Sequence, residues 1–144
     1  MSKKNSYLKN IKDLAEKNLK EGEAFLLKNK EREEVITLAS GLQYEIIQTG
    51  NGKIPTKKSK ILCHYKGYLL NGDVFDSSYK RKRPESFVVG ELIKGWVEAL
   101  TIMPTGSIWK LYIPSHLGYG FEALTPTSGG NCTLIFEMEL ISIL

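Results

Sequence analysis

The sequence contains few residues suited to metal binding or covalent catalysis, with only two histidines and two cysteines among 144 residues. Neither Cys63 nor Cys132 belongs to a CxxC pair, and no histidine stands at ligand spacing from either, which argues against a zinc site. Both cysteines lie in or beside apolar strand patterns. We therefore expect two small buried side chains, with a disulfide as the alternative. No metal and no cofactor is predicted.

The chain also lacks long hydrophobic runs. No apolar run approaches about 18 residues, so no membrane-spanning helix is predicted. The first residues, MSKKNSYLKN, lack the apolar core of a signal peptide. The chain as it stands is therefore predicted to be cytoplasmic, or periplasmic or in the cell envelope if a signal peptide was removed.

A strong excess of one charge is missing as well. The net charge of +4 comes from 20 basic and 16 acidic residues, a mixture too balanced to indicate nucleic-acid binding. The densest basic run, Lys80–Arg83, would suit a phosphate or an acidic partner, but a solvated loop is the favoured interpretation. We expect no nucleic-acid partner.

The region up to residue 39 is rich in Lys, Glu and Leu and has no proline. Its apolar residues recur at steps of three and four, which predicts a helix. Gly22 interrupts the pattern, so the segment is either two helices or one helix bent there. The stretch Lys28–Glu34 is predicted to be a solvated helical surface, and Gly41 to end the helical region. The apolar stripe consists of Leu8, Ile11, Leu14, Ala15, Leu19 and Leu26.

Three interpretations of this apolar stripe are open. It pairs with a second copy of the chain to form a homodimer, folds back onto the rest of the chain, or captures unfolded client proteins. Dimerisation is the interpretation that we favour.

From residue 40 onward the pattern changes to alternation, glycine and turns. Strands are predicted over 42–46, 61–70, 74–75, 87–89, 108–113 and 133–143, with one short helix over 92–100. A long loop over 114–131 is predicted to be a functional rim or a mobile segment. The fold class is α+β, an antiparallel half-wrapped sheet of five to six strands around one short helix, preceded by an N-terminal helical extension.

Aromatic and acidic residues combine in a pattern that predicts a small cavity. Asp76 is predicted to be buried beside Phe75, and Trp96 lies on the apolar stripe of the short helix, which suggests an aromatic-lined hollow with one carboxylate. No Ser-His-Asp set or phosphate loop accompanies it. Rotation about a prolyl peptide bond is one of the few reactions that such a pocket can catalyse, because that reaction makes and breaks no covalent bond.

Five ordered blocks resemble the FKBP-type peptidyl-prolyl cis-trans isomerases. They are HYKGYLLNG (64–72), VFDSS (74–78), LIKGW (92–96), KLYIPSHLGYG (110–120) and NCTLIFEMEL (131–140). SGLQY (40–44), after a charged helix, resembles the bacterial subgroup typified by the macrophage infectivity potentiator. The resemblance implies an isomerase domain over residues 40–144 and an N-terminal extension over residues 1–39 that makes a dimer in that subgroup.

The resemblance also implies a function and a set of site residues. It implies acceleration of X-Pro rotation in proline-containing polypeptides, assisting protein folding, and inhibition by macrolides of the FKBP class. Trp96 would form the cavity floor, and Tyr119 would offer its hydroxyl at the rim. The implied catalytic set is Tyr65, Phe75, Asp76, Trp96, Tyr119 and Phe136, with Arg81, Leu92 and Ile93 binding the substrate.

Two departures from the family pattern bear on activity. Glu85 follows Pro84, where the family often has an aromatic residue. The segment Phe121–Gly130 is polar where the family commonly carries two apolar residues and two prolines. This segment is predicted to overhang the pocket and to grip substrate or macrolide less firmly. The alternative function is therefore a chaperone module that binds proline segments with weak or no turnover.

Several other candidates are assigned structural roles. Asp76 is interpreted as orienting the local field, as pairing with Arg81 or Tyr65, or as both. His64 is predicted to be a strand residue without a catalytic role. No role is assigned to His116, and Trp109 is predicted to pack in the core.

Overall fold

The computed structural model describes residues 3–144 and begins with one long helix, α1 (Lys3–Asn29). The helix runs uninterrupted through Gly22, so the alternative of two helices is wrong. Gly22 is required by packing, because a Cβ at this position would lie 2.1 Å from Thr133 Oγ1. The glycine therefore lets the helix approach the strand region closely.

The helix ends earlier than the sequence pattern predicted. α1 stops at Asn29, and the prediction of helix over Lys28–Glu34 is wrong for most of that stretch. The Asn29 amide donates to Gln43 Oε1 at 2.9 Å, which fixes the helix end against the next strand. The chain then turns into β1 (Val35–Thr37), three β-branched residues that pair with β2.

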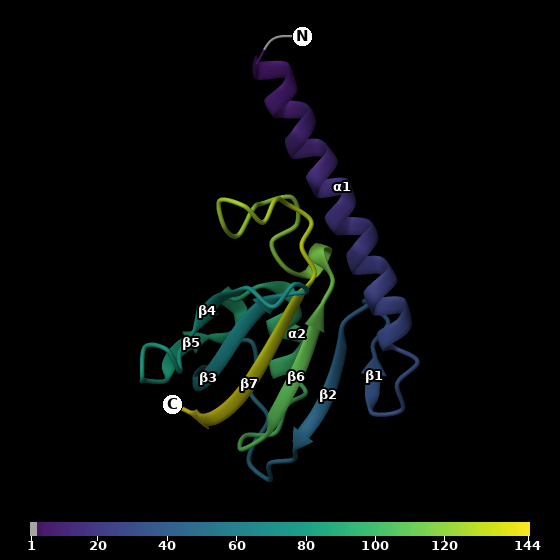
Figure 1. Ribbon diagram of the computed structural model, residues 1–144. Coiled ribbons are helices and arrows are strands. Elements are labelled where there is room, and N and C mark those ends of the chain that lie inside the picture. Colours follow the sequence, from purple (N-terminus) through teal and green to yellow (C-terminus); the bar gives the residue numbers. More distant parts are fainter. Residues whose placement is uncertain (1–2) are drawn as a thin grey trace.

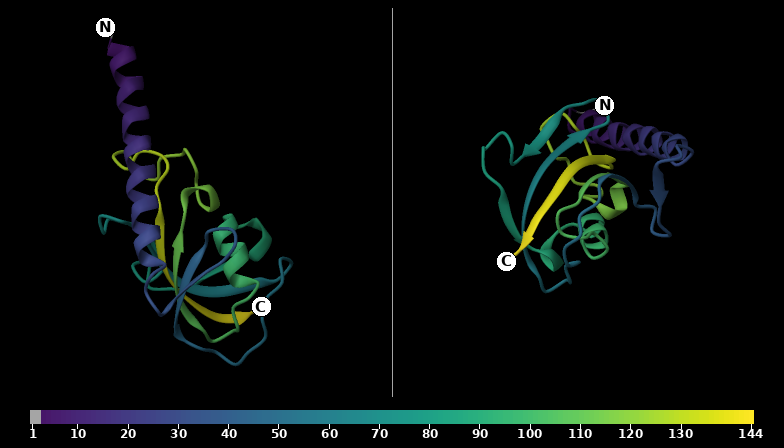
Figure 2. Two further views of the ribbon diagram at one scale, coloured as in Figure 1. Left: turned by 90° about the vertical axis from the view of Figure 1, so that its right-hand side faces the viewer. Right: turned by 90° about the horizontal axis from the view of Figure 1, so that it is seen from below.

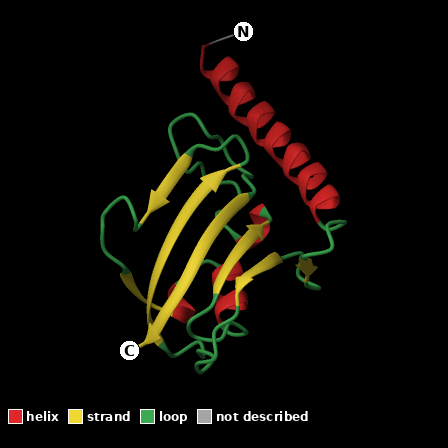
Figure 3. Cartoon of the chain, turned by 60° about the horizontal axis from the view of Figure 1, so that its bottom comes forward, coloured by secondary structure: helices red, strands yellow, loops and turns green. Residues whose placement is uncertain are grey.

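One antiparallel sheet forms most of the remaining structure (Figures 1 and 3). Its strand order is β1-β2-β6-β7-β3-β4, with β5 also pairing with β3. The sheet has seven strands, one more than the sequence indicated, because β1 was missed. The other strands are β2 (Gln43–Gln48), β3 (Lys60–Leu69), β4 (Val74–Ser77), β5 (Glu85–Val88), β6 (Ile108–Ile113) and β7 (Leu134–Ile143).

The main core lies between one face of this curved sheet and the short helix α2 (Lys94–Leu100), as Figure 2 shows. Two 3-10 turns, η1 (Val89–Glu91) and η2 (Ser115–Leu117), flank α2 and β6. Strict alternation along β3 buries Ile61, Cys63 and Tyr65 on the face toward α2, as predicted. The predicted α+β fold is confirmed.

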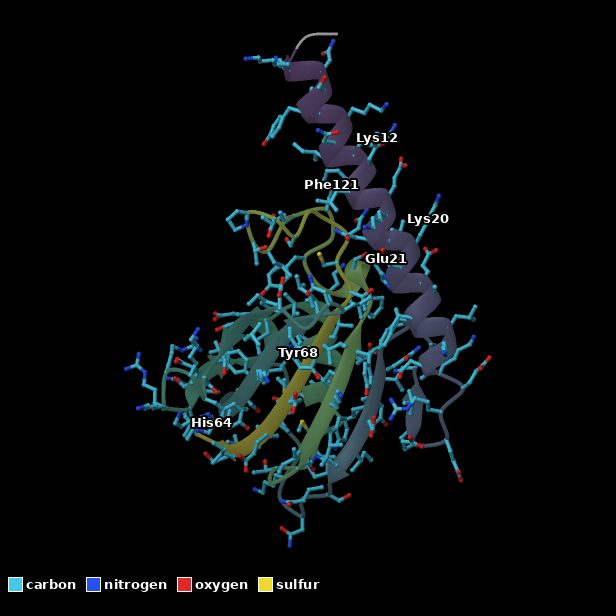
Figure 4. The ribbon with its side chains drawn as sticks, in the orientation of Figure 1. Lys12, Lys20, Glu21, His64, Tyr68 and Phe121 are labelled. Carbon is cyan, nitrogen blue, oxygen red and sulfur yellow. The ribbon has the colours of Figure 1, made fainter. Side chains whose placement is uncertain are left out.

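The C-terminal part of α1 packs onto the opposite face of the sheet. Phe25 and Leu26 contact a small buried cluster of Val35, Tyr112 and Ile135. Tyr68, labelled in Figure 4, belongs to the same cluster. The helix therefore folds back onto the sheet over part of its length. The division into residues 1–39 and 40–144 stays a prediction.

Cys63 and Cys132 are both free thiols, so the disulfide alternative is wrong. Cys63 is fully buried in the core, and burial raises the pKa of its thiol to about 12. Cys132 is only partly buried. Within residues 3–144, no helix combines the length and hydrophobicity that crossing a membrane requires.

Candidate functional site

A cavity of about 110 Å³ is lined by residues of the sheet, of α2 and of the loops between them. Trp96 of α2 is buried, and its ring stands nearly perpendicular to the neighbouring rings. Its ring centroid lies 5.0 Å from Tyr65 and 5.1 Å from Phe136, both in edge-to-face geometry. Phe75 packs edge-to-face on Phe136 at 5.5 Å. The cavity is lined by Tyr65, Phe75, Asp76, Phe87, Leu92, Ile93, Trp96, Tyr119 and Phe136.

The local sequence explains how these rings meet. Tyr65 and Gly67 point to the same face of β3, because side chains alternate along a strand. Gly67 leaves room for two aromatic walls, since a Cβ there would lie 2.6 Å from Phe136 Cε1 and 2.7 Å from Phe75 Cζ. The glycine is therefore a requirement of the cavity.

A charged cluster closes one side of the cavity. The Tyr65 hydroxyl donates to Asp76 Oδ2 at 2.7 Å, and Arg81 Nη1 donates to Asp76 Oδ1 at 2.6 Å. Arg81 also donates from Nη2 to the Tyr65 hydroxyl at 2.9 Å and from Nε to Glu85 Oε1 at 3.0 Å. Asp76 was predicted to be buried, but its side chain is 40% exposed and is paired with the similarly exposed Arg81.

The Tyr65 hydroxyl and the Arg81 guanidinium of this cluster keep their protons at neutral pH. Burial raises the pKa of Tyr65, and the hydrogen bond to Asp76 raises it further. The hydrogen bonds of Arg81 to Asp76, Tyr65 and Glu85 raise its pKa as well. Tyr65 thus stays neutral and Arg81 stays cationic at neutral pH. Asp76 accepts hydrogen bonds at both oxygens, which fits an orienting role better than that of a general base.

Tyr119 completes the mouth of the cavity from the loop after η2. Its side chain is 41% exposed. Partial burial and the negative charges of Asp76 and Glu122 raise the pKa of its hydroxyl. The hydroxyl therefore remains protonated and able to donate a hydrogen bond at neutral pH.

The structure brings together the residues that the sequence singled out. All of them line the cavity except Arg81, which lies beside it and bonds to Asp76 and Tyr65. Phe87 was missed as a lining residue, although its edge-to-face contact with Trp96 at 5.8 Å places it in the wall. Phe87 stands two residues before the buried Val89, and residues at that spacing share one face of a strand. This spacing was the signal that could have identified Phe87 as a lining residue. The roles of these residues stay predictions.

The expectation that Phe121–Gly130 overhangs the pocket is wrong. No residue of this segment lines the cavity, and its end lies against α1 instead. Figure 4 shows Phe121 on the part of the loop next to α1. The segment is held because the Asn18 amide bonds to the carbonyls of Ser128 and Gly130.

Two further candidates, His64 and Trp109, make packing contacts outside the cavity. His64 stacks on Tyr79 at 4.5 Å between ring centroids and lies 2.7 Å from Ser78 Oγ. Figure 4 shows it at the side of the sheet away from α1. Trp109 stacks on Tyr44 at 4.4 Å, outside the cavity.

Comparison with known proteins assigns the chain to a family. Residues 51–141 match the family of FKBP-type peptidyl-prolyl cis-trans isomerases. Residues 1–46 match the domain amino terminal to FKBP-type peptidyl-prolyl isomerase. The two matched regions follow the order of the structure, in which α1 precedes most of the sheet.

Curated relatives share this assignment. Peptidyl-prolyl cis-trans isomerase Mip of Coxiella burnetii is 47% identical over 88% of this chain and 55% of its own length. The outer membrane protein MIP of Legionella longbeachae is 44% identical over 90% of this chain and 55% of its own length. The FKBP-type 22 kDa isomerase of Escherichia coli is 44% identical over 86% of this chain and 60% of its own length. The chain thus spans little more than half the length of these relatives.

Solved structures resemble the whole arrangement of helix and sheet. FkpA from Escherichia coli matches with a TM-score of 0.91 and 34% identity, over 97% of this chain and 65% of that one. A peptidyl-prolyl cis-trans isomerase from Pseudomonas syringae matches with a TM-score of 0.81 and 34% identity, over 89% of this chain and 94% of that one. The sequence and the fold thus agree that this chain belongs to the family of FKBP-type peptidyl-prolyl cis-trans isomerases.

Proposed function

We propose that this chain accelerates cis-trans rotation about X-Pro bonds in proline-containing polypeptides and so assists protein folding. The observation that carries the proposal is the aromatic cavity between the sheet and α2, with Trp96 as its floor and a neutral hydroxyl at its mouth. Membership of the isomerase family supports the same function. The cavity volume of about 110 Å³ suits a single small ring.

The mechanism rests on preferential binding of the twisted peptide bond. Rotation faces a barrier of about 18–20 kcal/mol because resonance keeps the peptide planar. The planar amide has the larger dipole, which water solvates well. An apolar cavity removes that advantage, so the twisted state becomes relatively more favourable. Each reduction of about 1.4 kcal/mol in the barrier gives a tenfold gain in rate.

The polar residues would orient the substrate. Tyr119 would donate to a substrate carbonyl and hold one side of the bond while the other side rotates. The cluster of Tyr65, Asp76 and Arg81 would fix the cavity wall and the local field. Leu92 and Ile93 would contact the ring. No covalent step and no proton transfer is required.

A matched pair of variants tests the proposal. Phe75 and Tyr68 are both half-buried aromatic residues, but only Phe75 lines the cavity. In an isomerisation assay on a proline-containing peptide, Phe75→Ala should lose most of the activity, whereas Tyr68→Ala should retain it. An unsubstituted protein with no turnover above background would refute the proposal.

A second candidate function is a chaperone module that holds proline segments with little turnover. It is favoured by the polar segment Phe121–Gly130, which lies against α1 and leaves the mouth of the cavity uncovered on that side. Suppression of client aggregation by an unsubstituted protein that shows no turnover of a proline-containing peptide would support this candidate over the isomerase.

Ligands, oligomeric state and location are further parts of the proposal. We propose that macrolides of the FKBP class compete with the peptide substrate for the cavity. We also propose that two copies of the chain form a homodimer through exposed apolar residues of α1 such as Tyr7 and Leu8. Light scattering at two protein concentrations tests the dimer. A location in the cell envelope is supported by the relative named as an outer membrane protein.

A further inference from the structure

The helix α1 is joined to the loop that follows the cavity rim. Asn18 Nδ2 donates to Ser128 O at 2.7 Å and to Gly130 O at 2.9 Å. Between these carbonyls, Gly129 has a φ of +70°, and a Cβ there would lie 2.5 Å from Leu14 Cγ. The glycine lets the loop backbone lie directly on the helix, so one amide side chain binds two carbonyls that are two residues apart in the loop.

Asn131 extends this contact to the cavity mouth. Its side-chain Nδ2 donates to Ala15 O on α1 at 3.3 Å, and its backbone N–H donates to Gly120 O at 2.7 Å. Its φ of +57° is uncommon outside glycine and brings both donors into place. Gly120 follows Tyr119 directly, and Tyr119 lines the cavity. A continuous chain of contacts therefore leads from α1 to the rim.

The loop has little packing of its own to hold it in this position. Phe121 is 63% exposed, and Leu124 is the residue of the segment that packs against the main core. Most of its other contacts lie within the segment, where Ser128 Oγ accepts from the backbone of Leu124 and Thr125. The hydrogen bonds to α1 thus act together with the packing of Leu124 and the backbone bond from Gly120 N–H to Ser115 O in fixing the loop relative to the sheet.

We propose that α1 is a positioning element for the isomerase site and that Asn18 is its key residue. By holding residues 128–131, Asn18 keeps Gly120 in place and thereby sets where the Tyr119 hydroxyl meets the substrate. This inference rests on the proposed function of the cavity. It assigns a role to a helix residue that touches no part of the cavity, and it means that displacement of α1 changes substrate affinity.

Hydrogen exchange tests the structural part of the proposal. Asn18→Ala removes both donors, and Asn10→Ala is the matched control, because Asn10 is an exposed residue of the same helix. Asn18→Ala should speed exchange of the Asn131 amide by about tenfold, as expected for the loss of supporting hydrogen bonds. Amides of β7 should be unchanged, which separates local loosening from unfolding. Unchanged exchange at Asn131 would overturn the proposal.

Kinetics test the link to Tyr119. Asn18→Ala should raise KM about threefold to tenfold with kcat almost unchanged, because a contact made in both ground and transition states is weakened. In a Tyr119→Phe background the same substitution should change KM by less than about twofold, since the two residues act through one contact. An equal loss in both backgrounds would overturn the proposal. If the unsubstituted protein shows no turnover, the proposed function fails, and the exchange result alone decides the role of α1.

Discussion

Gly67→Ala would test whether the aromatic walls form the working surface of the cavity. The new Cβ would lie 2.6 Å from Phe136 Cε1 and 2.7 Å from Phe75 Cζ, whereas ordinary contact begins at 3.4 Å. The two rings would therefore have to withdraw by 0.8 and 0.7 Å. Phe136 is only 3% exposed and packs against Trp96, so it resists displacement, whereas the half-buried Phe75 moves more readily.

The cost of this displacement is expected in both stability and activity. Overpacking of this kind lowers the free energy of unfolding by about 1–3 kcal/mol. A shift of nearly 1 Å in a positioning wall costs up to about 100-fold in rate, so we expect kcat/KM to fall at least about tenfold. Urea unfolding measures the free energy of unfolding, and an isomerisation assay on a proline-containing peptide measures kcat/KM.

A second glycine provides the control for Gly67→Ala. A Cβ at Gly52 would lie 2.7 Å from Thr105 Cβ, in a region that does not line the cavity. Gly52→Ala should therefore destabilise the fold without lowering kcat/KM of the folded protein. If Gly67→Ala loses stability but keeps its kcat/KM within about twofold of the unsubstituted protein, the inference from these walls to catalysis is wrong.

Three further predictions follow from the polar cluster and the core. Tyr65→Phe should lower the free energy of unfolding by about 0.5–1.5 kcal/mol in urea titrations, because the hydroxyl bonds to both Asp76 and Arg81. Asp76→Asn should produce a small loss of stability that shrinks at high salt, because the pair with Arg81 is exposed to solvent; a loss that salt does not reduce would contradict this. Between about pH 9 and pH 12 the unfolded chain releases the Cys63 proton that the folded chain retains, so stability should fall as pH rises, and less steeply in Cys63→Ala. Equal slopes for the two proteins would contradict the burial of this thiol.

The strands around the cavity were predictable because their signals are local. Alternation along residues 61–70 placed Ile61, Cys63 and Tyr65 on one face, and β3 follows that pattern. The short helix around Trp96 was equally clear from its apolar spacing. Both predictions hold because the sheet and α2 each bury one face, and the spacing of apolar residues along the sequence reflects a buried face.

The errors occurred where long-range contacts outweigh local preference. The charged stretch after Asn29 has helical composition, yet the chain leaves the helix there because Val35–Thr37 pairs with β2. The burial of Asp76 was overestimated, since its apolar neighbours in sequence do not show that the carboxylate faces Arg81 at a half-open edge of the cavity. The direction of the loop around Ser128 depends on Asn18, which lies 110 residues earlier in the chain, and no local pattern indicates such a contact.

The position of β3 between β4 and β7 has a consequence for how the protein acquires its site during synthesis. Of the described strands, β7 leaves the ribosome last, yet it pairs with β3 along nearly its full length and contributes Phe136 to the cavity. Before β7 is synthesised, the nascent chain therefore contains Tyr65 and Phe75 but lacks Phe136, so the cavity is incomplete. A protein proposed to help others fold has to delay the assembly of this sheet until β7 emerges, and until then the edge of β3 that pairs with β7 is open to association with other chains.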